Sequence, residues 1–266
     1  MVLFPTSCIP QPLQNWRIST KLADRMPAGT LETPPPVGAA LPGWQAPPAP
    51  QHTALEGRYC RLEALRAAQH AAALYTANAP DISGHSWTYM PYGPFAQLAD
   101  YQRWVEQSAA STDPLFFAII ERSSMHAAGV ASYLRITPAS GSIEVGHIHY
   151  SPVLARTRAA TEAMYLLMQQ AFQLGYRRYE WKCDSLNAPS RAAALRLGFS
   201  FEGVFRQATV YKQRSRDTAW YAMIDTEWPA LQAAFERWLA PENFDAAGRQ
   251  RSALSALTSA ALQQRA

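Results

Sequence analysis

Hydrophobic and polar residues follow a regular pattern only from about Gly57 onward. From there, short apolar or alternating runs that predict β-strands are interspersed with stretches whose apolar residues recur at the 3.6-residue spacing of a helix. The predicted strands cover residues 58–63, 115–121, 129–136, 142–150, 177–183, 199–212 and 218–224, and the predicted helices cover residues 66–78, 94–108, 158–174, 189–197 and 228–239.

The order of these elements predicts the fold class. The strands between residues 115 and 150 follow one another across short turns, which is typical of an antiparallel meander. After residue 150 the order is helix, strand, helix, strand, strand. Together they indicate an α+β fold with one mixed, mostly antiparallel sheet flanked by helices.

Prolines divide the chain. Eleven of the twenty prolines lie in the first 50 residues, and proline is not accommodated inside helices or central strands. We therefore interpret residues 1–52 as an extended, poorly ordered arm and residues 53–240 as the folded domain. Residues 241–266 form a tail rich in Ala, Gln and Ser whose weak periodicity allows a helix.

Composition narrows the class of partner. A net charge of +4 over 266 residues does not indicate a nucleic-acid partner, but it suits an anionic ligand that carries phosphates. The three cysteines are odd in number and form no CxxC pair, so we expect neither a disulfide framework nor a metal site. The sequence shows no signal peptide and no apolar run of membrane-spanning length, so we expect a cytoplasmic protein without a membrane partner.

The segment around residue 158 predicts an anion site. It passes from a strand through a tight turn into a helix, and the first N–H groups of a helix lack partners and carry partial positive charge. Arg156 and Arg158 stand at this helix start, and arginine matches phosphate oxygens well.

Three groups of residues carry a family resemblance. The helix start Ala160-Thr161-Glu162-Ala163 and the run Asn187-Ala188-Pro189-Ser190-Arg191, followed by Leu197-Gly198-Phe199 and Glu202-Gly203, are similar to motifs of the GNAT superfamily, as is Arg216-Asp217 before the last strand. The branch that they resemble includes the ribosomal-protein N-terminal alanine and serine acetyltransferases, and the resemblance spans about residues 55–239. One departure is the phosphate-binding loop, where Arg158 replaces the usual central glycine.

The resemblance implies a GNAT-type N-acetyltransferase fold and an enzyme that moves an acetyl group from acetyl-CoA to a primary amine. The preferred acceptor is the N-terminal α-amine of a protein or peptide, and a small-molecule amine such as an aminoacyl nucleotide or a toxin is the alternative. Two readings of other classes are a non-catalytic acyl-CoA-binding module and an interaction protein that docks through the arm and the tail.

The resemblance also implies site residues. Ser190 is the candidate general acid beside the CoA sulfur, or else a helix-start hydroxyl, and Glu144 is the candidate that orders a water or the amine, or else a solvated carboxylate. His147 and His149 share a strand face and either line the acceptor site or pack against neighbours. The candidate cofactor-binding residues are Leu154, Arg156, Arg158, Ala159, Ala160, Thr161, Asn187 and Arg191.

Overall fold

The structure of the chain is a computed structural model that describes residues 35–263. It divides into two compact units, Met1–Trp44 and Gln45–Ala266. In the first unit, the described residues 35–44 are exposed and contain no helix or strand, apart from a turn at residues 42–43. All elements discussed below belong to the second unit.

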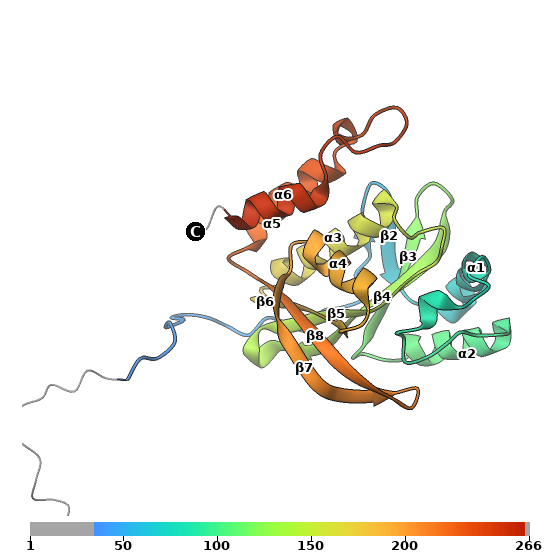
Figure 1. Cartoon of the computed structure of the whole chain (residues 1–266), viewed down its shortest axis with the longest axis horizontal. Coiled ribbons are helices and arrows are strands. Elements are labelled where there is room, and N and C mark those ends of the chain that lie inside the picture. Colours follow the sequence, from blue (N-terminus) through green and yellow to red (C-terminus); the bar gives the residue numbers. More distant parts are fainter. Residues whose placement is uncertain (1–34, 264–266) are drawn as a thin grey trace, which may run out of the picture. The chain divides into compact units, whose positions relative to one another are not determined.

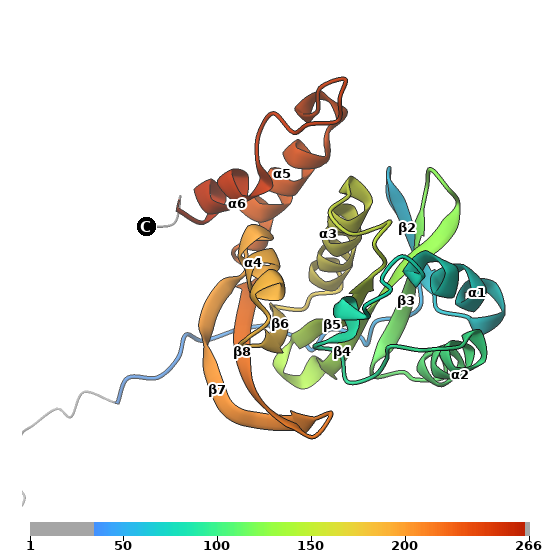
Figure 2. The ribbon, with the colours of Figure 1, turned by 45° about the vertical axis from the view of Figure 1, so that its right-hand side comes forward.

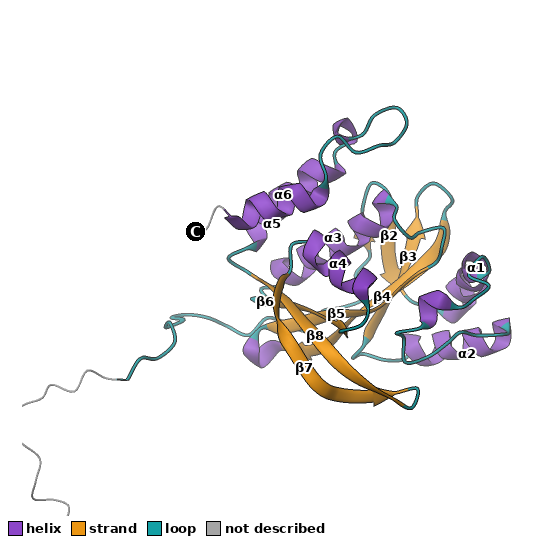
Figure 3. Ribbon diagram, in the orientation of Figure 1, coloured by secondary structure: helices purple, strands orange, loops and turns teal. Residues whose placement is uncertain are grey.

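Within the described residues of the second unit, the strands form one eight-stranded sheet in the order β1-β2-β3-β4-β5-β6-β8-β7. The strands are β1 (Leu55–Glu56), β2 (Cys60–Ala64), β3 (Leu115–Glu121), β4 (His126–Thr137), β5 (Ser142–Tyr150), β6 (Arg178–Asp184), β7 (Ser200–Tyr211) and β8 (Arg214–Ile224). Among these strands only β5 and β6 pair in parallel. The predicted α+β class with a mixed, mostly antiparallel sheet is confirmed (Figure 3).

The helices cover the sheet from two sides. They are α1 (Ala67–Asn78), α2 (Leu98–Ala109), α3 (Arg158–Gln173), α4 (Ala188–Arg196), α5 (Trp228–Leu239) and α6 (Leu254–Gln263). On β3, Phe117 and Ile119 point into a core formed with α3 to α6, whereas Phe116 and Ile120 point into a second core formed with α1 and α2. This two-residue alternation explains why β3 is continuously apolar. Figures 1 and 2 show α1 and α2 on one side of the sheet and α3 and α4 on the other.

One predicted element boundary differs by several residues. The sequence predicts that Pro94 opens a helix, but α2 begins at Leu98, after Gln97 in an extended conformation. Phe95 instead packs its ring edge-on against Trp87, with ring centroids 5.5 Å apart. A tertiary aromatic contact therefore outweighs the local preference of proline for a first helical turn.

The second compact unit reaches back into the proline-rich stretch. The unit begins at Gln45, so it takes in residues 45–52, which the sequence assigns to the arm. A hydrogen bond from the Tyr176 hydroxyl to the Pro48 carbonyl, at 3.2 Å, joins this stretch to the rest of the unit.

The tail belongs to the same unit. Helix α6 lies in it and buries Leu254 and Thr258, whose hydroxyl donates to the Arg196 carbonyl at the end of α4. None of the helices in residues 35–263 combines the length and the apolar character needed to cross a membrane.

Candidate active site

The sheet opens between β5 and β6. These parallel strands pair only through residues 142–145 and 178–181, although β5 runs on to Tyr150 and β6 to Asp184. Beyond the last pair, β5 stays with β4 and β6 stays with β8. The facing edges of the two strands therefore present backbone N–H and C=O groups that no ladder between them uses.

A β-bulge in β5 lies at the start of this opening. Gly146 pairs with Ser132 and His149 with Val130, so β5 has two residues where β4 has one. His147, in the bulge, has a φ of 49°, in the left-handed region that residues with a Cβ rarely adopt. Such strained backbone gathers at functional sites, so the bulge marks this part of β5 as a candidate site.

The loop of residues 151–157 leads from the end of β5 into α3. Thr157 caps the helix, because its Oγ1 accepts a hydrogen bond from the Ala160 N–H at 3.1 Å. The N–H groups of Arg158 and Ala159 have no acceptor within the helix, and the helix dipole adds partial positive charge. Arg156 is exposed and has a φ of 65°. Together they form a site suited to anionic oxygens.

The other residues predicted in this loop are packed. Leu154 is fully buried and its N–H and C=O both form hydrogen bonds within the loop. The side chains of Ala159 and Ala160 are buried, and Thr161 Oγ1 accepts hydrogen bonds from the Arg196 guanidinium at 3.3 Å. The two alanines can therefore contribute only backbone groups to a ligand, and Leu154 supports the loop from inside.

The Arg158 side chain, which stands where the family usually has glycine, is held outside the phosphate-binding loop. Its guanidinium lies over the rings of Tyr59 and Phe244, at 5.0 and 4.4 Å from the ring centroids. In the sequence, Tyr59 lies near the start of the second unit and Phe244 lies near its end. The side chain thus turns away from the loop, while its backbone stays at the helix start.

This geometry predicts different effects for the two arginines. Arg156→Ala should weaken acetyl-CoA binding by about tenfold, since a charge-assisted hydrogen bond is lost. Arg158→Ala should change the dissociation constant by less than about twofold and lower the free energy of unfolding by about 1 kcal/mol through its lost cation–π contacts. Calorimetric titration and urea unfolding of both variants would test this, and equal losses of affinity would contradict it.

A second helix N-terminus, that of α4, carries Asn187 and Ser190. Asn187 Oδ1 accepts a hydrogen bond from the Ser190 N–H at 3.1 Å, so Asn187 caps the helix. Ser190 Oγ accepts from Trp181 Nε1 at 3.0 Å. Because the oxygen accepts here, the hydroxyl hydrogen can be donated to another group. Trp181 is in the last residue pair of β5 and β6, so this bond holds Ser190 where the strands part.

Arg191 has two protein partners, and the Cys183 thiol is buried. Arg191 donates from Nε to the Tyr221 hydroxyl and from Nη1 to the Ser185 carbonyl, both at 3.2 Å. Burial raises the pKa of the Cys183 thiol, which argues against a nucleophilic thiolate.

Glu144 lies in a buried ionic network rather than in solvent. Its carboxylate is 2.8 Å from Nη1 of Arg135 and 2.8 Å from Nζ of Lys182. Lys182 also contacts Glu180 at 2.7 Å, and its ammonium lies 3.7 Å from the centroid of the Trp220 ring. Glu144 and Glu180 face each other across β5 and β6, and Lys182 lies between these two like charges and reduces their repulsion. Burial raises the pKa of Glu144, and the two cations oppose this shift.

We expect Glu144→Gln to lower the free energy of unfolding by about 2 kcal/mol, less than for an unpaired buried charge because Lys182 keeps Glu180. Urea unfolding would measure it. Glu202→Gln, which breaks an exposed pair with Arg178, is the matched control and should cost less than about 1 kcal/mol. A loss of activity of about 10²-fold with unchanged stability would instead assign Glu144 the role of a base.

The two histidines of β5 contact the loop between α1 and α2. His147 Nδ1 is 3.0 Å from the Tyr92 hydroxyl. His149 Nε2 is 2.9 Å from Ser86 Oγ, and its ring stacks on Trp87 with centroids 3.6 Å apart. The histidine side chains therefore join the opened strand to this aromatic loop.

Both histidines are neutral near neutral pH. Burial, aided by the charge of Arg135, lowers the pKa of His147 to about 4. Burial also lowers the pKa of His149 to about 4, although the Asp81 carboxylate opposes the shift. The two imidazoles therefore add no positive charge to this side of the sheet near neutral pH.

The α1–α2 loop is tied to the other half of the sheet. Lys212 Nζ, in the β7–β8 turn, donates to the Trp87 carbonyl at 2.9 Å. The Tyr89 hydroxyl donates to the Leu186 carbonyl, before α4, at 3.1 Å. These bonds connect the loop that contacts β5 with the part of the sheet beyond β6.

Among residues 35–263, no three His, Cys, Asp or Glu side chains are grouped to hold a metal ion. The family model of the acetyltransferase (GNAT) domain matches residues 60–200, more than half of the chain. The chain belongs to the GNAT acetyltransferase family. It is therefore an acetyltransferase, and enzymes of this family use acetyl-CoA.

Solved structures agree with this membership. A GCN5-related N-acetyltransferase from Brucella melitensis is 47% identical, with a TM-score of 0.81 over 82% of this chain and 100% of that one. A GNAT-family protein from Chromobacterium violaceum is 43% identical, with a TM-score of 0.68 over 74% of this chain and 100% of that one. A search of proteins with curated functions finds no match.

For more distant structures, the likeness to this GNAT acetyltransferase shows the fold alone. The microcin C7 self-immunity acetyltransferase MccE, in complex with acetyl-CoA and AMP, is 24% identical, with a TM-score of 0.56 over 63% of this chain and 93% of that one. RimL, a ribosomal L7/L12 α-N-protein acetyltransferase, is 20% identical, with a TM-score of 0.55 over 65% of this chain and 94% of that one. The resemblance to the ribosomal-protein branch is therefore distant, and the GNAT family itself is shown.

The structure adds residues to this GNAT site that sequence reasoning missed. Trp181 positions Ser190, and Lys182 connects Glu144 with Glu180. A lysine within a strand of alternating pattern could have indicated that Lys182 pairs with a buried carboxylate. No local feature of the sequence indicates that Trp181 is the partner of Ser190. Glu162, in the motif at the start of α3, accepts hydrogen bonds from three successive N–H groups of residues 58–60 and so anchors α3 to β2.

Proposed function

We propose that this chain transfers the acetyl group of acetyl-CoA to a primary amine, preferably the N-terminal α-amine of a protein or peptide. The observation that carries the proposal is the parting of β5 and β6 between two helix N-termini, with Ser190 held at the point of parting. In this proposal the phosphates of acetyl-CoA bind the start of α3 near Arg156, and Asn187 and Arg191 lie along its path toward Ser190.

The proposed reaction is a direct transfer. The neutral amine attacks the thioester carbonyl, a carbon–nitrogen bond forms, and the carbon–sulfur bond then breaks. The amine releases its proton to water, and the thiolate takes a proton from Ser190, which regains one from solvent. An α-amine with a pKa of about 8 is neutral in a useful fraction near pH 7, so positioning and oxyanion stabilisation are the main tasks of the protein.

Two features support these roles. The hydrogen bond from Trp181 fixes Ser190 Oγ as an acceptor and leaves its hydrogen for the sulfur. The bulge at His147 leaves backbone groups of β5 outside the regular ladder, where an N–H group could stabilise the developing oxyanion. The free, buried thiols Cys60 and Cys183 suit the reducing cytoplasm that we propose for this enzyme.

A small-molecule amine is the second candidate acceptor. The bonds from Lys212 and Tyr89 cross the parted strands close to the histidines, which is consistent with a compact acceptor. The distant likeness to MccE is compatible with such an acceptor.

Calorimetric titration with acetyl-CoA, and separately with CoA, is the first test. We expect saturable one-to-one binding of both, followed by turnover in a panel that contains peptides beginning with alanine or serine and small aminoacyl compounds. Turnover of peptides alone would support the α-amine, and turnover of small amines alone would replace it with the second candidate. Binding without any turnover would assign a non-catalytic acyl-CoA-binding role, and absence of binding at millimolar ligand would refute the cofactor site.

A further inference from the structure

Arg216, on β8, belongs to a family motif to which the proposed reaction assigns no role. Ala219 and Tyr221 of the same strand point into the core formed with α3 to α6. Arg216, Thr218 and Trp220 alternate with them along β8, and side chains at this two-residue spacing share one face of a sheet. Arg216 therefore faces the opposite side of the sheet, the side on which α1 and α2 pack.

The Arg216 side chain is held in one orientation. Its Nε donates a hydrogen bond to Thr218 Oγ1 at 3.2 Å, and its guanidinium lies 5.7 Å from the centroid of the Tyr211 ring. Tyr211 is held in turn, because its hydroxyl donates to Asp184 Oδ2 at 2.9 Å. Within residues 35–263, Nη1 and Nη2 of Arg216 form neither a hydrogen bond nor an ion pair. These two nitrogens match the two oxygens of a carboxylate.

Arg216 lies near the point where β5 and β6 part. Thr218, which holds its Nε, pairs with Asp184 at the end of β6. Burial raises the pKa of the neighbouring Cys183 thiol, and the Ser190 hydroxyl and the charge of Arg216 oppose this shift. A charge acts on a pKa in this way only over a short distance. Arg216 and the proposed proton donor Ser190 therefore lie near the same thiol.

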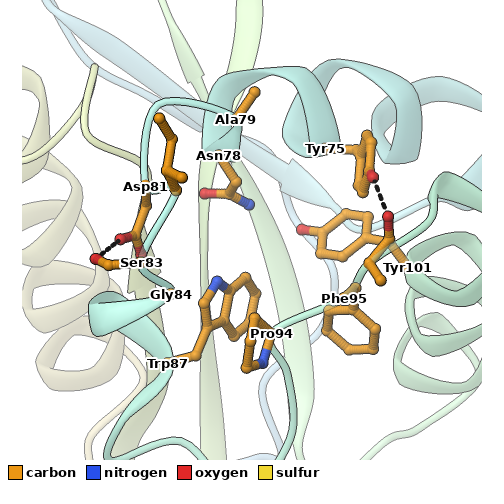
Figure 4. A pocket seen from close by; sticks show the side chains of 12 residues that line it. Tyr75, Asn78, Ala79, Asp81, Ser83, Gly84, Trp87, Pro94, Phe95 and Tyr101 are labelled. Atoms are coloured by element: carbon orange, nitrogen blue, oxygen red, sulfur yellow. Dashed lines mark hydrogen bonds between the residues drawn. The ribbon is translucent and has the colours of Figure 1, made fainter.

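The hairpin that carries Arg216 is joined to the loop between α1 and α2. Lys212 Nζ, at the tip of the hairpin, donates to the Trp87 carbonyl at 2.9 Å, and the Trp87 ring stacks on His149 of β5. The loop is also held by its own bonds, such as the one from Ser83 Oγ to Asp81 Oδ1 at 3.2 Å (Figure 4). The arginine thus belongs to the same side of the proposed site as the histidines.

The hairpin of β7 and β8 carries an excess of positive charge. Its acidic residues are engaged, since Glu202 pairs with Arg178 and Asp217 Oδ1 accepts a hydrogen bond from the Gln207 N–H at 2.7 Å. The exposed cations of the hairpin are Arg206, Lys212 and Arg214. None of these cations forms an ion pair with another residue of the range 35–263, so this side of the sheet attracts anionic ligands.

We propose that Arg216 binds a carboxylate of the acceptor, so that the preferred acceptor carries an acidic group close to its primary amine. This inference rests on the proposed acetyl transfer and names the substrate class of that site. The two carboxylate oxygens accept hydrogen bonds from Nη1 and Nη2, while Thr218 keeps the guanidinium oriented. The carboxylate is supplied either by an acidic second residue of a peptide or by the main-chain carboxylate of a small amino compound.

The test uses acceptors that differ by one carboxylate. The tripeptides Ser-Asp-Ala and Ser-Asn-Ala, both with amidated C-termini, represent the side-chain source. The dipeptide Ser-Ala with a free or an amidated C-terminus represents the main-chain source. For wild-type protein we expect the KM of the acid to be about tenfold lower than that of its amide, as for one charge-assisted hydrogen bond. The pair that shows this preference identifies the source, and equal KM values within both pairs would overturn the proposal.

Variants of Arg216 test whether this residue causes the preference. In Arg216→Gln the amide-to-acid ratio of KM values should fall from about ten to about one. Arg216→Lys keeps the charge without the planar fork and should give an intermediate ratio. Arg206→Gln, which changes an exposed arginine of the same hairpin, alters the net charge equally and should keep the ratio. A ratio that persists in Arg216→Gln, or that falls equally in Arg206→Gln, would refute a direct contact.

Calorimetry separates this inference from the proposed function, because binding requires no transfer. The two tripeptides are titrated into the full chain in the presence of CoA. A tenfold preference for the acid that Arg216→Gln abolishes would support the carboxylate site even if no amine is acetylated. Turnover of amines without any preference for the acid would support the transfer and overturn the carboxylate site. Absence of binding of both tripeptides at millimolar concentration would also overturn it.

Discussion

Replacing Ser190 with alanine should lower kcat by about 10²-fold or more while the dissociation constant of acetyl-CoA changes by less than about twofold. The structure makes this a clean substitution. The cap of α4 joins Asn187 Oδ1 to the backbone N–H of Ser190, and alanine keeps that N–H. The substitution therefore removes the proton donor and leaves the helix start intact. Single-turnover kinetics and calorimetry would separate the two quantities.

Two further variants control for an indirect effect. Asn187→Ala removes the cap and should lower the free energy of unfolding by about 1 kcal/mol. Trp181→Phe removes the N–H that positions Ser190 Oγ and should reduce kcat less than loss of the hydroxyl itself. An equal loss of rate and affinity in Ser190→Ala would show that Ser190 is only a structural residue.

The second large effect is a loss of stability on the acidic side. His147 and His149 have a pKa of about 4 in the folded chain, against an ordinary value of 6.5. The unfolded chain therefore binds more protons between these values, so their contribution to stability is complete above about pH 6.5 and is lost as the pH falls toward about 4. At about 1.4 kcal/mol per pKa unit, with partial relaxation of the site on protonation, we expect a loss of about 3 kcal/mol for the pair.

Urea unfolding at a series of pH values would measure this loss. His149→Gln should remove about half of the dependence between pH 6.5 and 4, whereas His126→Gln, which changes an exposed histidine at the start of β4, should leave it unchanged. Carboxylates whose pKa is lowered in the folded chain, such as Glu180, lose their contribution to stability at a lower pH than the histidines do. A stability profile that is flat above pH 4 would show that the histidines are not held neutral.

Much of the fold was readable because local and tertiary preferences agree. Helix α3 begins after the Thr157 cap and ends before Gly175, which has a φ of 95°, and its buried stripe matches the apolar spacing in the sequence. Strand β1 has only two residues, too few for a pattern to predict. The late start of α2 depends on the packing of Phe95 against Trp87, which local sequence does not encode.

The candidate site was readable in part for a similar reason. Residues in motifs, such as Asn187 and Ser190, occupy positions fixed by a helix start, and the structure brings both to the point where β5 and β6 part. The surroundings of Glu144 depend on the register that sets it opposite Glu180. The position of Arg158 between Tyr59 and Phe244 requires residues that are about a hundred positions away in the sequence. Such partners are decided by the folded chain as a whole.

The short pairing of β5 with β6 also has a mechanical meaning. Four residue pairs connect β1 to β5 with β6 to β8, so we expect bending of the sheet to concentrate at this junction, beside which α3 and α5 pack together. A molecule that lies between β5 and β6 and contacts both strands would oppose this bending. Bound acetyl-CoA would thus be a reactant and would also stiffen the sheet. We expect the sheet to be more flexible after the product has left than during the transfer.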